Sequence, residues 1–198
     1  VETRSFARLA IEHFASRELR GGIEIGRVEE LTTGRAVFTD VVITDEEGRV
    51  VISAPRVTAW PDLWRLYEDG TIWRLYRDGT IRIAGGLVED AEVVLYTGGE
   101  DGLDVSLVGA FQPANPGTEG GEPVHIVIDG LDVRRATVHG DAPRYPGLRA
   151  EGMDVVGRIE IEREVRIQVF TGHGHMVAPY PGTTELDHVT VDFTTART

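Results

Sequence analysis

The chain has no cysteine, no lysine and no long hydrophobic run, and each absence excludes a class of function. Without cysteine, its 198 residues have no disulfide, thiol nucleophile or thiolate metal site. No stretch approaches the roughly 18 to 20 consecutive apolar residues of a transmembrane helix, so no membrane span is expected within it. All basic residues are arginine and the formal net charge is −13. Nucleic acid is therefore not an expected partner, because phosphate binding requires a concentrated basic surface.

Catalytic sequence motifs are also lacking. There is no nucleophile elbow, phosphate-binding loop or zinc-protease motif. His173 and His175 have the spacing of two metal ligands on one strand face, but nothing specifies further ligands, and a glycine-rich turn explains the spacing equally well. The many carboxylates occur mainly at turns and on polar strand faces. We predict no catalytic residue, no metal site and no cofactor.

What the chain has in abundance is alternation of apolar and polar residues. From Val124 onward, aliphatic residues recur at alternate positions in residues 124–128, 155–161, 165–169 and 189–193. Successive side chains of a strand point to opposite faces, so these runs indicate antiparallel strands with one apolar and one polar face. The predicted fold is mainly β: an antiparallel twisted sheet that forms an open groove or half-barrel.

One amphipathic helix is predicted at the amino terminus, from about residue 2 to residue 19. Its apolar face consists of Phe6, Leu9, Ala10 and Phe14, at helical spacing. The glycine pair at residues 21–22 ends the pattern. We expect this helix to cap one end of the sheet.

Turn residues divide the chain that follows into short β units. Residues 37–44 form a predicted strand, and the turn at residues 45–48 leads into another strand at residues 50–52. Pro55 is expected to interrupt the chain before a further strand at residues 57–60, because proline cannot donate a ladder hydrogen bond.

The chain is predicted to have two β segments. The first comprises residues 1–112 and includes a strand at residues 103–107 after a glycine-rich turn. Residues 113–122 form a loop or linker, since they hold proline, glycine and polar residues without a large apolar side chain. The second, residues 123–198, is expected to continue the same sheet.

Residues 64–72 and 73–81 are near copies of one another. A tandem duplication explains them, and a functional aromatic patch is the alternative. That patch would consist of Trp60, Trp64, Tyr67, Trp73 and Tyr76.

The order of elements in the first half resembles that of AsmA and TamB-like proteins. Residues 9–14 and 22–28 resemble the helix and the glycine-flanked strand of that family. Residues 34–57, with the pair Asp40 and Val41, resemble the glycine, aspartate and valine pattern that follows. The likeness covers roughly residues 6–96 and contains no catalytic residue. Departures from the family are the second Trp-Arg-Leu-Tyr copy and the proline-rich insert at residues 112–122.

The resemblance implies a periplasmic protein of the bacterial envelope, anchored to the inner membrane by a segment upstream of Val1. It implies that phospholipid acyl chains bind in an apolar β groove and move towards the outer membrane, without chemical turnover. Envelope or outer-membrane proteins are the further partners that it suggests.

The apolar face supplies the candidate lipid-binding residues. An aliphatic side chain left in water forgoes roughly 1.5 to 3 kcal/mol, so a row of them must meet a core, a partner or a lipid. The predicted groove residues are Val41, Ile43, Ile52, Val93, Leu95, Leu103, Val105, Leu107, Ile126, Ile159, Ile161, Ile167 and Val191.

Two other functions fit the same pattern. A structural or interaction module could close the sheet over its own core and bind no ligand. A carbohydrate-active enzyme that uses carboxylates and exposed tryptophan is the third hypothesis.

Overall fold

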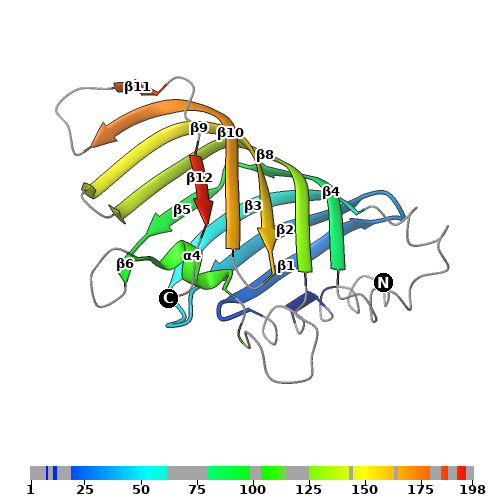
Figure 1. Ribbon diagram of the computed structural model, residues 1–198. Coiled ribbons are helices and arrows are strands. Elements are labelled where there is room, and N and C mark those ends of the chain that lie inside the picture. Colours follow the sequence, from blue (N-terminus) through cyan, green and yellow to red (C-terminus); the bar gives the residue numbers. More distant parts are fainter. Residues whose placement is uncertain are drawn as a thin grey trace.

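The computed structural model describes residues 8, 11–12, 19–61, 80–98, 104–112, 114, 125–142, 145–162, 165–178, 184–186 and 191–194. Strands dominate this part of the chain (Figure 1). In chain order the elements are β1 (Gly22–Leu31), β2 (Ala36–Thr44), β3 (Val50–Pro61), β4 (Thr80–Glu89), β5 (Glu92–Leu95), β6 (Thr97–Gly98), β7 (Asp104–Val105), α4 (Ser106–Ala110), β8 (His125–Ala142), β9 (Tyr145–Ile161), β10 (Val165–Ala178), β11 (Thr184–Leu186) and β12 (Val191–Thr194).

Ten of these strands form one sheet. Eight follow the order β1-β2-β3-β4-β8-β9-β10-β11, while β5 pairs with β3 and β8, and β12 pairs with β10. Neighbours are antiparallel except that β4 and β5 run parallel to β8. The prediction of a mainly β, mainly antiparallel fold is confirmed. Strands from before and after the predicted linker lie side by side in this sheet.

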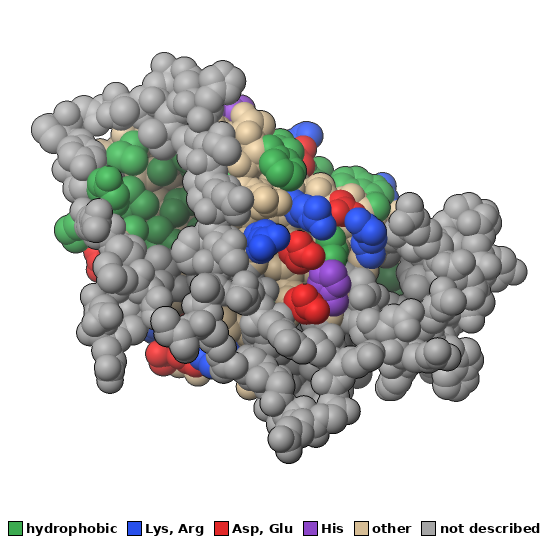
Figure 2. All heavy atoms as spheres, viewed as in Figure 1, with side chains coloured by type: hydrophobic (Ala, Val, Ile, Leu, Met, Phe, Trp, Pro, Cys, Tyr) green, Lys and Arg blue, Asp and Glu red, His purple; other side chains and the backbone are tan. Residues whose placement is uncertain are grey.

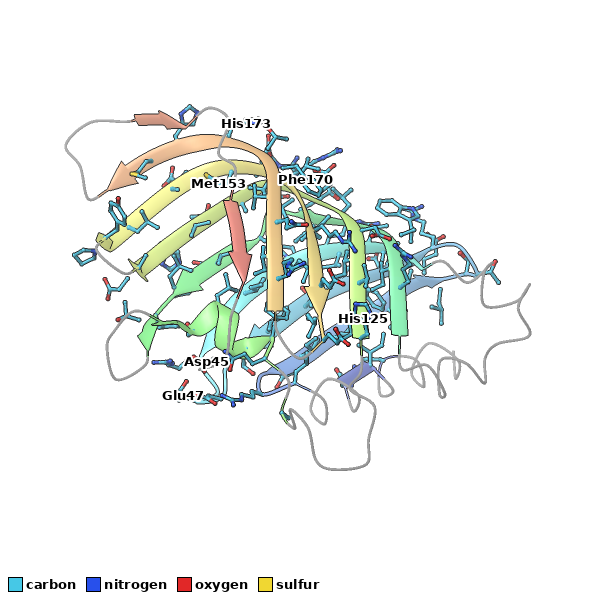
Figure 3. The ribbon with its side chains drawn as sticks, viewed as in Figure 1. Asp45, Glu47, His125, Met153, Phe170 and His173 are labelled. Carbon is cyan, nitrogen blue, oxygen red and sulfur yellow. The ribbon has the colours of Figure 1, made fainter. Side chains whose placement is uncertain are left out.

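The turn between β2 and β3 forms where it was predicted. Asp45 is buried, and its carboxylate accepts hydrogen bonds from the backbone N–H groups of Glu47 (3.1 Å) and Arg49 (2.8 Å). Gly48 takes a positive φ of 79°, which glycine adopts without strain. Figure 3 shows Asp45 and Glu47 at this turn. An aspartate that bonds to its own turn is a common reason for this residue type at such positions.

The expected interruption at Pro55 is wrong. β3 runs without a break from Val50 to Pro61. Pro55 lies between Ala54, which pairs with Val41, and Arg56, which pairs with Thr39. On the other side of β3, the chain passes from β4 to β5 at this level. The missing N–H of proline therefore falls where the neighbouring ladder is interrupted.

The strand predicted at residues 103–107 is also wrong in part. Only Asp104 and Val105 are extended, as β7, and they pair with β6 in a separate two-stranded sheet. The chain then turns into the short helix α4. After α4, Gln112 accepts a hydrogen bond from the N–H of Arg20 (2.8 Å), and Ala110 accepts one from Gly21 (3.1 Å). These bonds fix the end of α4 beside the start of β1.

Most of the predicted amino-terminal helix lies outside the described residues, as do residues 62–79, which hold most of the duplicated segments. Of residues 1–18, only Arg8, Ile11 and Glu12 are described. Glu12 accepts a hydrogen bond from the N–H of Ile25 (2.9 Å), and Arg8 donates one to the carbonyl of Gly26 (3.2 Å). Glu12 and Arg8 thus form hydrogen bonds with backbone groups of β1, which is an edge strand of the sheet.

The alternation is interrupted once in each of β1, β2, β3 and β8, and once at the junction of β4 and β5. At this point two consecutive residues lie between two apolar residues that belong to the same buried cluster. The apolar pairs are Ile25 and Val28, Phe38 and Val41, Ala54 and Val57, Val88 and Ala91, and Val133 and Ala136. Three residues within these interruptions, Asp40, Asp90 and Arg135, have φ of 54°.

We call this line of interruptions the crease, and the face that carries the apolar pairs the inner face. Figure 1 shows β8, β9 and β10 bending in their middle, so that the inner face is concave. Bulges shift the register between Val133 and Ala136 of β8 and between Val169 and Thr171 of β10. Bulges increase local twist and bend a strand, which accounts for the curvature.

Candidate functional site

The concave inner face is the candidate site, and three predicted groove residues lie in one row across it. Residues paired directly across neighbouring strands share a face. Ile43 of β2 pairs with Ile23 and with Ile52, and Ile52 pairs in turn with Val93 of β5. Val93 pairs with Val138 of β8. The five side chains therefore form one aliphatic row that crosses five strands.

A second group of predicted residues meets beyond the crease. Ile126, Ile159 and Ile167 pack against the buried cluster formed by Leu19 and Ile161. Ile159 pairs directly with Ile167 of β10. Phe111, just after α4, packs against the same cluster. The segment after α4 thus contacts this end of the inner face, a contact that the predicted strand at residues 103–107 did not suggest.

The remaining predicted residues are divided between the site and other places. Val41 is buried in the cluster along the crease. Leu95 ends β5 and pairs with Gly140. Leu107 lies on α4, so its predicted place on a strand is wrong. Val105 belongs to the separate two-stranded sheet, which is a second correction.

Two predicted residues are described only in part or not at all. Val191 is in β12 and pairs with Val169, but its side chain is not among those described. Leu103 lies outside the described residues.

Side chains are buried to very different degrees along the inner face. At the crease, Ala54, Ala91 and Ala136 are 2–3% exposed, because the inside of a bend leaves room only for small side chains. The row from Ile23 to Val138 is half-buried throughout. Figure 2 shows hydrophobic side chains gathered at the left of the view, over the ends of β8 and β9. Val37, which adjoins Phe38 in β2, is 1% exposed and is buried on the opposite face.

The opposite, outer face carries ion pairs between strands. Arg82 of β4 donates to Asp129 of β8 (2.6 Å), and Arg158 of β9 lies 3.6 Å from the same carboxylate. His125 of β8 lies 2.9 Å from Glu160 of β9. Figure 2 shows these charge types together near the middle of the view, where Figure 3 labels His125. The outer face thus carries these ion pairs, and Val127, which pairs with Arg82 and with Glu160, is also buried on it (3% exposed).

One ion pair with two hydrogen bonds lies on the crease. The Arg135 guanidinium donates two hydrogen bonds to Asp90, from Nε (2.7 Å) and from an Nη (2.9 Å). This pairing lowers the pKa of the Asp90 carboxyl and raises that of Arg135. Sequence analysis missed this pair. Its signal was the repeated interruption of alternation by two polar residues, Glu89-Asp90 and Arg134-Arg135.

The lowered pKa of Asp90 predicts a specific loss of stability in acid. A carboxyl whose pKa is lower in the folded than in the unfolded chain stabilises the fold above the unfolded value of about 3.9. That contribution disappears as the pH falls through the folded pKa. The wild type should therefore melt higher than Asp90→Asn at neutral pH, and the two melting temperatures should converge below about pH 4. Parallel melting curves from pH 7 to pH 3, followed by circular dichroism, would contradict this.

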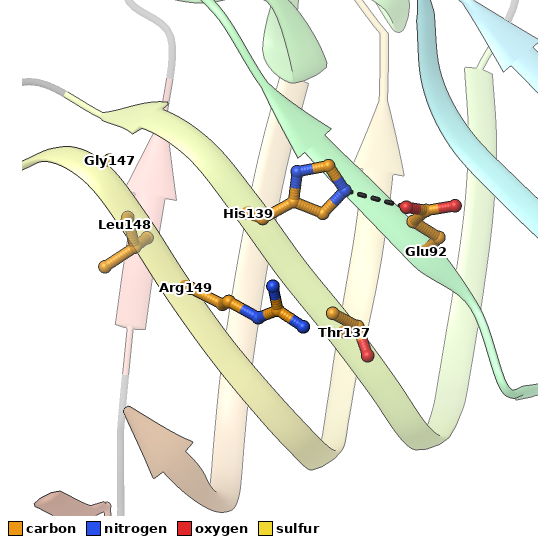
Figure 4. A pocket seen from close by; sticks show the side chains of 6 residues that line it. All are labelled: Glu92, Thr137, His139, Gly147, Leu148 and Arg149. Atoms are coloured by element: carbon orange, nitrogen blue, oxygen red, sulfur yellow. Dashed lines mark hydrogen bonds and ion pairs between the residues drawn. The ribbon is translucent and has the colours of Figure 1, made fainter. Parts of the chain in front are cut away.

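A recess of about 410 Å³ lies on β5, β8 and β9 (Figure 4). In it the His139 imidazole lies 2.8 Å from the Glu92 carboxylate, beside Thr137 and Arg149. The Arg149 guanidinium pairs with Glu151 (2.7 Å). Within the described part of the chain, the hydrogen-bond partner of the His139 ring is Glu92, and no nucleophile lies at hydrogen-bond distance from it.

His173 and His175, which have the spacing of two metal ligands, both lie on β10. His173 lies 3.2 Å from Asp154. Within the part of the chain that the structure describes, no group of three or more His, Asp or Glu residues is arranged to hold a metal ion. The same part contains no helix long and apolar enough to cross a membrane.

Comparison with known proteins gave no match: no family model, no curated protein and no solved structure matches the chain. The resemblance to AsmA and TamB-like proteins stays a prediction from the sequence.

Proposed function

We propose that this chain is a non-catalytic lipid-binding module of the bacterial cell envelope. Its concave inner face would form an open groove that holds phospholipid acyl chains. The observation that carries this proposal is the aliphatic row from Ile23 to Val138, which crosses five strands and is half-buried along its whole length. An apolar ligand that covers such a row removes its surface from water, which favours binding by roughly 25 cal/mol for each Å² covered.

The distribution of charge supports an apolar ligand. The ion pairs named above lie on the outer face, and the residues of the row are all aliphatic. An acyl chain has no polar group to satisfy and needs only an apolar surface of suitable shape. A periplasmic location, an inner-membrane anchor upstream of Val1, transfer towards the outer membrane and contacts with envelope proteins belong to the proposal through the sequence resemblance.

Site-specific crosslinking tests the proposal. A photo-crosslinking amino acid at Ile159, on the inner face, should capture phospholipid when the protein is produced in a bacterial envelope. The same amino acid at the neighbouring Arg158, on the outer face, is the matched control and should capture none. Mass spectrometry of the gently purified protein should also detect co-purified phospholipid.

Two results would contradict the proposal. Equal capture at both positions would indicate nonspecific contact with membrane. Absence of lipid at Ile159 and in the mass spectrum would favour the structural module with a closed core.

A further inference from the structure

The crease is held on its outer side by a chain of polar contacts that crosses several strands. Arg135 of β8 binds Asp90, at the junction of β4 and β5, through the two hydrogen bonds already described. An Nη of Arg135 also lies 3.6 Å from Glu89. The backbone N–H of Arg135 donates to the Asp154 carboxylate of β9 (2.7 Å). The other oxygen of Asp154 lies 3.2 Å from His173 of β10, which Figure 3 labels at the bend.

The backbone at this place adopts a conformation that these residues do not favour by themselves. Asp90 and Arg135 both have φ of 54°. Outside glycine this left-handed conformation costs roughly 1 to 2 kcal/mol for each residue, although aspartate tolerates it better than most. The two strained residues are paired with each other, and the N–H of one of them is bound by Asp154. The polar contacts therefore offset the cost of the bend at the point where it arises.

Backbone hydrogen bonds on either side of Asp90 show how closely the bend depends on this junction. The N–H of Asp90 donates to the carbonyl of Arg134 (2.9 Å), and the N–H of Thr137 donates to the carbonyl of Ala91 (2.8 Å). β4 and β5 thus both remain joined to β8, although two residues separate them. In a straight pair of strands, neither β8 nor the segment from β4 to β5 would contain an additional residue at this point.

We infer that Arg135, Asp90 and Asp154 are positioning residues that keep the sheet bent and thereby set the width of the concave inner face. The link from width to acyl-chain binding rests on the proposed function, whereas the link from these residues to the bend does not. Long apolar ligands touch the inner face, and the three residues act on them only through the curvature of β8 and β9.

The chain provides a matched control for this inference. Arg134 pairs with Asp132 at 2.6 Å, close to the crease and on exposed side chains. Both residues belong to β8, so their ion pair joins no two strands. Asp90→Asn and Asp132→Asn remove the same charge, and asparagine tolerates a positive φ as aspartate does.

The absence of cysteine allows the bend to be measured directly. Spin labels can be attached to cysteines at Arg149, in β9, and at Glu162, the residue directly after β9. Both positions are exposed, and they lie on the two sides of the crease. Thirteen residues of straight strand would separate them by about 43 Å between backbone atoms, and a bent strand brings them closer. Pulsed electron paramagnetic resonance should give a longer and broader distance distribution for Asp90→Asn than for the wild type. Asp132→Asn should leave the distribution unchanged.

Arg135→Gly gives a second, independent variant. Glycine fits the backbone at φ of 54° but removes the guanidinium, so its distances should also lengthen. Unchanged distances in Asp90→Asn and Arg135→Gly, with circular dichroism showing folded protein, would overturn the inference. Equal lengthening in Asp132→Asn would also overturn it, because the effect would then be one of general charge.

Binding of a long-chain fluorescent fatty acid separates the two parts of the inference. Affinity should fall severalfold in Asp90→Asn and stay unchanged in Asp132→Asn. If the distances lengthen while the affinity stays at the wild-type value, the control of groove width is wrong. If the wild type binds no fatty acid although Asp90→Asn still lengthens the distances, the proposed function fails and the role of the three residues in the bend stands.

Discussion

Aspartate in place of Ala136 is expected to unfold the protein, whereas aspartate in place of Val138, two positions further along β8, is expected to leave it folded. Ala136 is 2% exposed within the cluster at the crease, where a carboxylate would have neither water nor a partner. An unpaired buried charge of this kind costs on the order of 4 kcal/mol. Val138 is half-buried in the aliphatic row, and a carboxylate there can turn towards water if the groove is open. Its expected cost is about 1 kcal/mol.

Urea unfolding followed by circular dichroism measures the difference. Serine at both positions serves as the control for polarity without charge. An open groove also predicts that Val138→Asp binds fatty acid much more weakly than the wild type, because a charge then lies in the acyl-chain path. If both aspartate variants unfold equally, the inner face is closed and dry at both positions, and the structural module becomes the better hypothesis.

The strands and their facing could be predicted because alternation is a local property of the sequence. Ile126 and Ile128, or Ile159 and Ile161, define the apolar side of their strands without reference to any other residue. The turn at Asp45 could be predicted for the same reason, since its hydrogen bonds lie within four residues.

The crease could not be recognised from one strand alone. A pair such as Arg134-Arg135 looks like a minor irregularity, and only the pairing of neighbouring strands shows that equivalent pairs lie in a line. Pro55 was misinterpreted for this reason. Proline disfavours a strand because it has no N–H to donate to the ladder. The neighbouring strands are also irregular at the level of Pro55, however, and require no hydrogen bond from it.

The parallel pairing of β4 with β8 is similarly invisible in the sequence. Alternation has no direction, so the periodicity of Ile81 and Ile83 is the same for a parallel and an antiparallel neighbour. The helix α4 was missed because Leu103, Val105 and Leu107 alternate as a strand does. The contacts of the chain after α4 with Arg20 and Gly21 are set by tertiary structure, which outweighs local preference in so short a segment.

Alanine in place of Gly140 should destabilise the fold far more than alanine in place of Gly147, and the comparison tests the parallel junction of β5 and β8. Gly140 has φ of 120°, and a Cβ there would overlap the backbone carbonyl of Leu95, its partner in β5. Gly147 also has a positive φ, 67°, but nothing lies within 4 Å of its Cβ position. The backbone strain common to both substitutions costs roughly 1 to 2 kcal/mol. The overlap should raise the cost of Gly140→Ala to about 4 kcal/mol in urea unfolding, because Leu95 can yield only by separating β5 from β8. Equal costs for the two variants would show that β5 does not lie against Gly140, and the parallel pairing at this edge of the aliphatic row would be wrong.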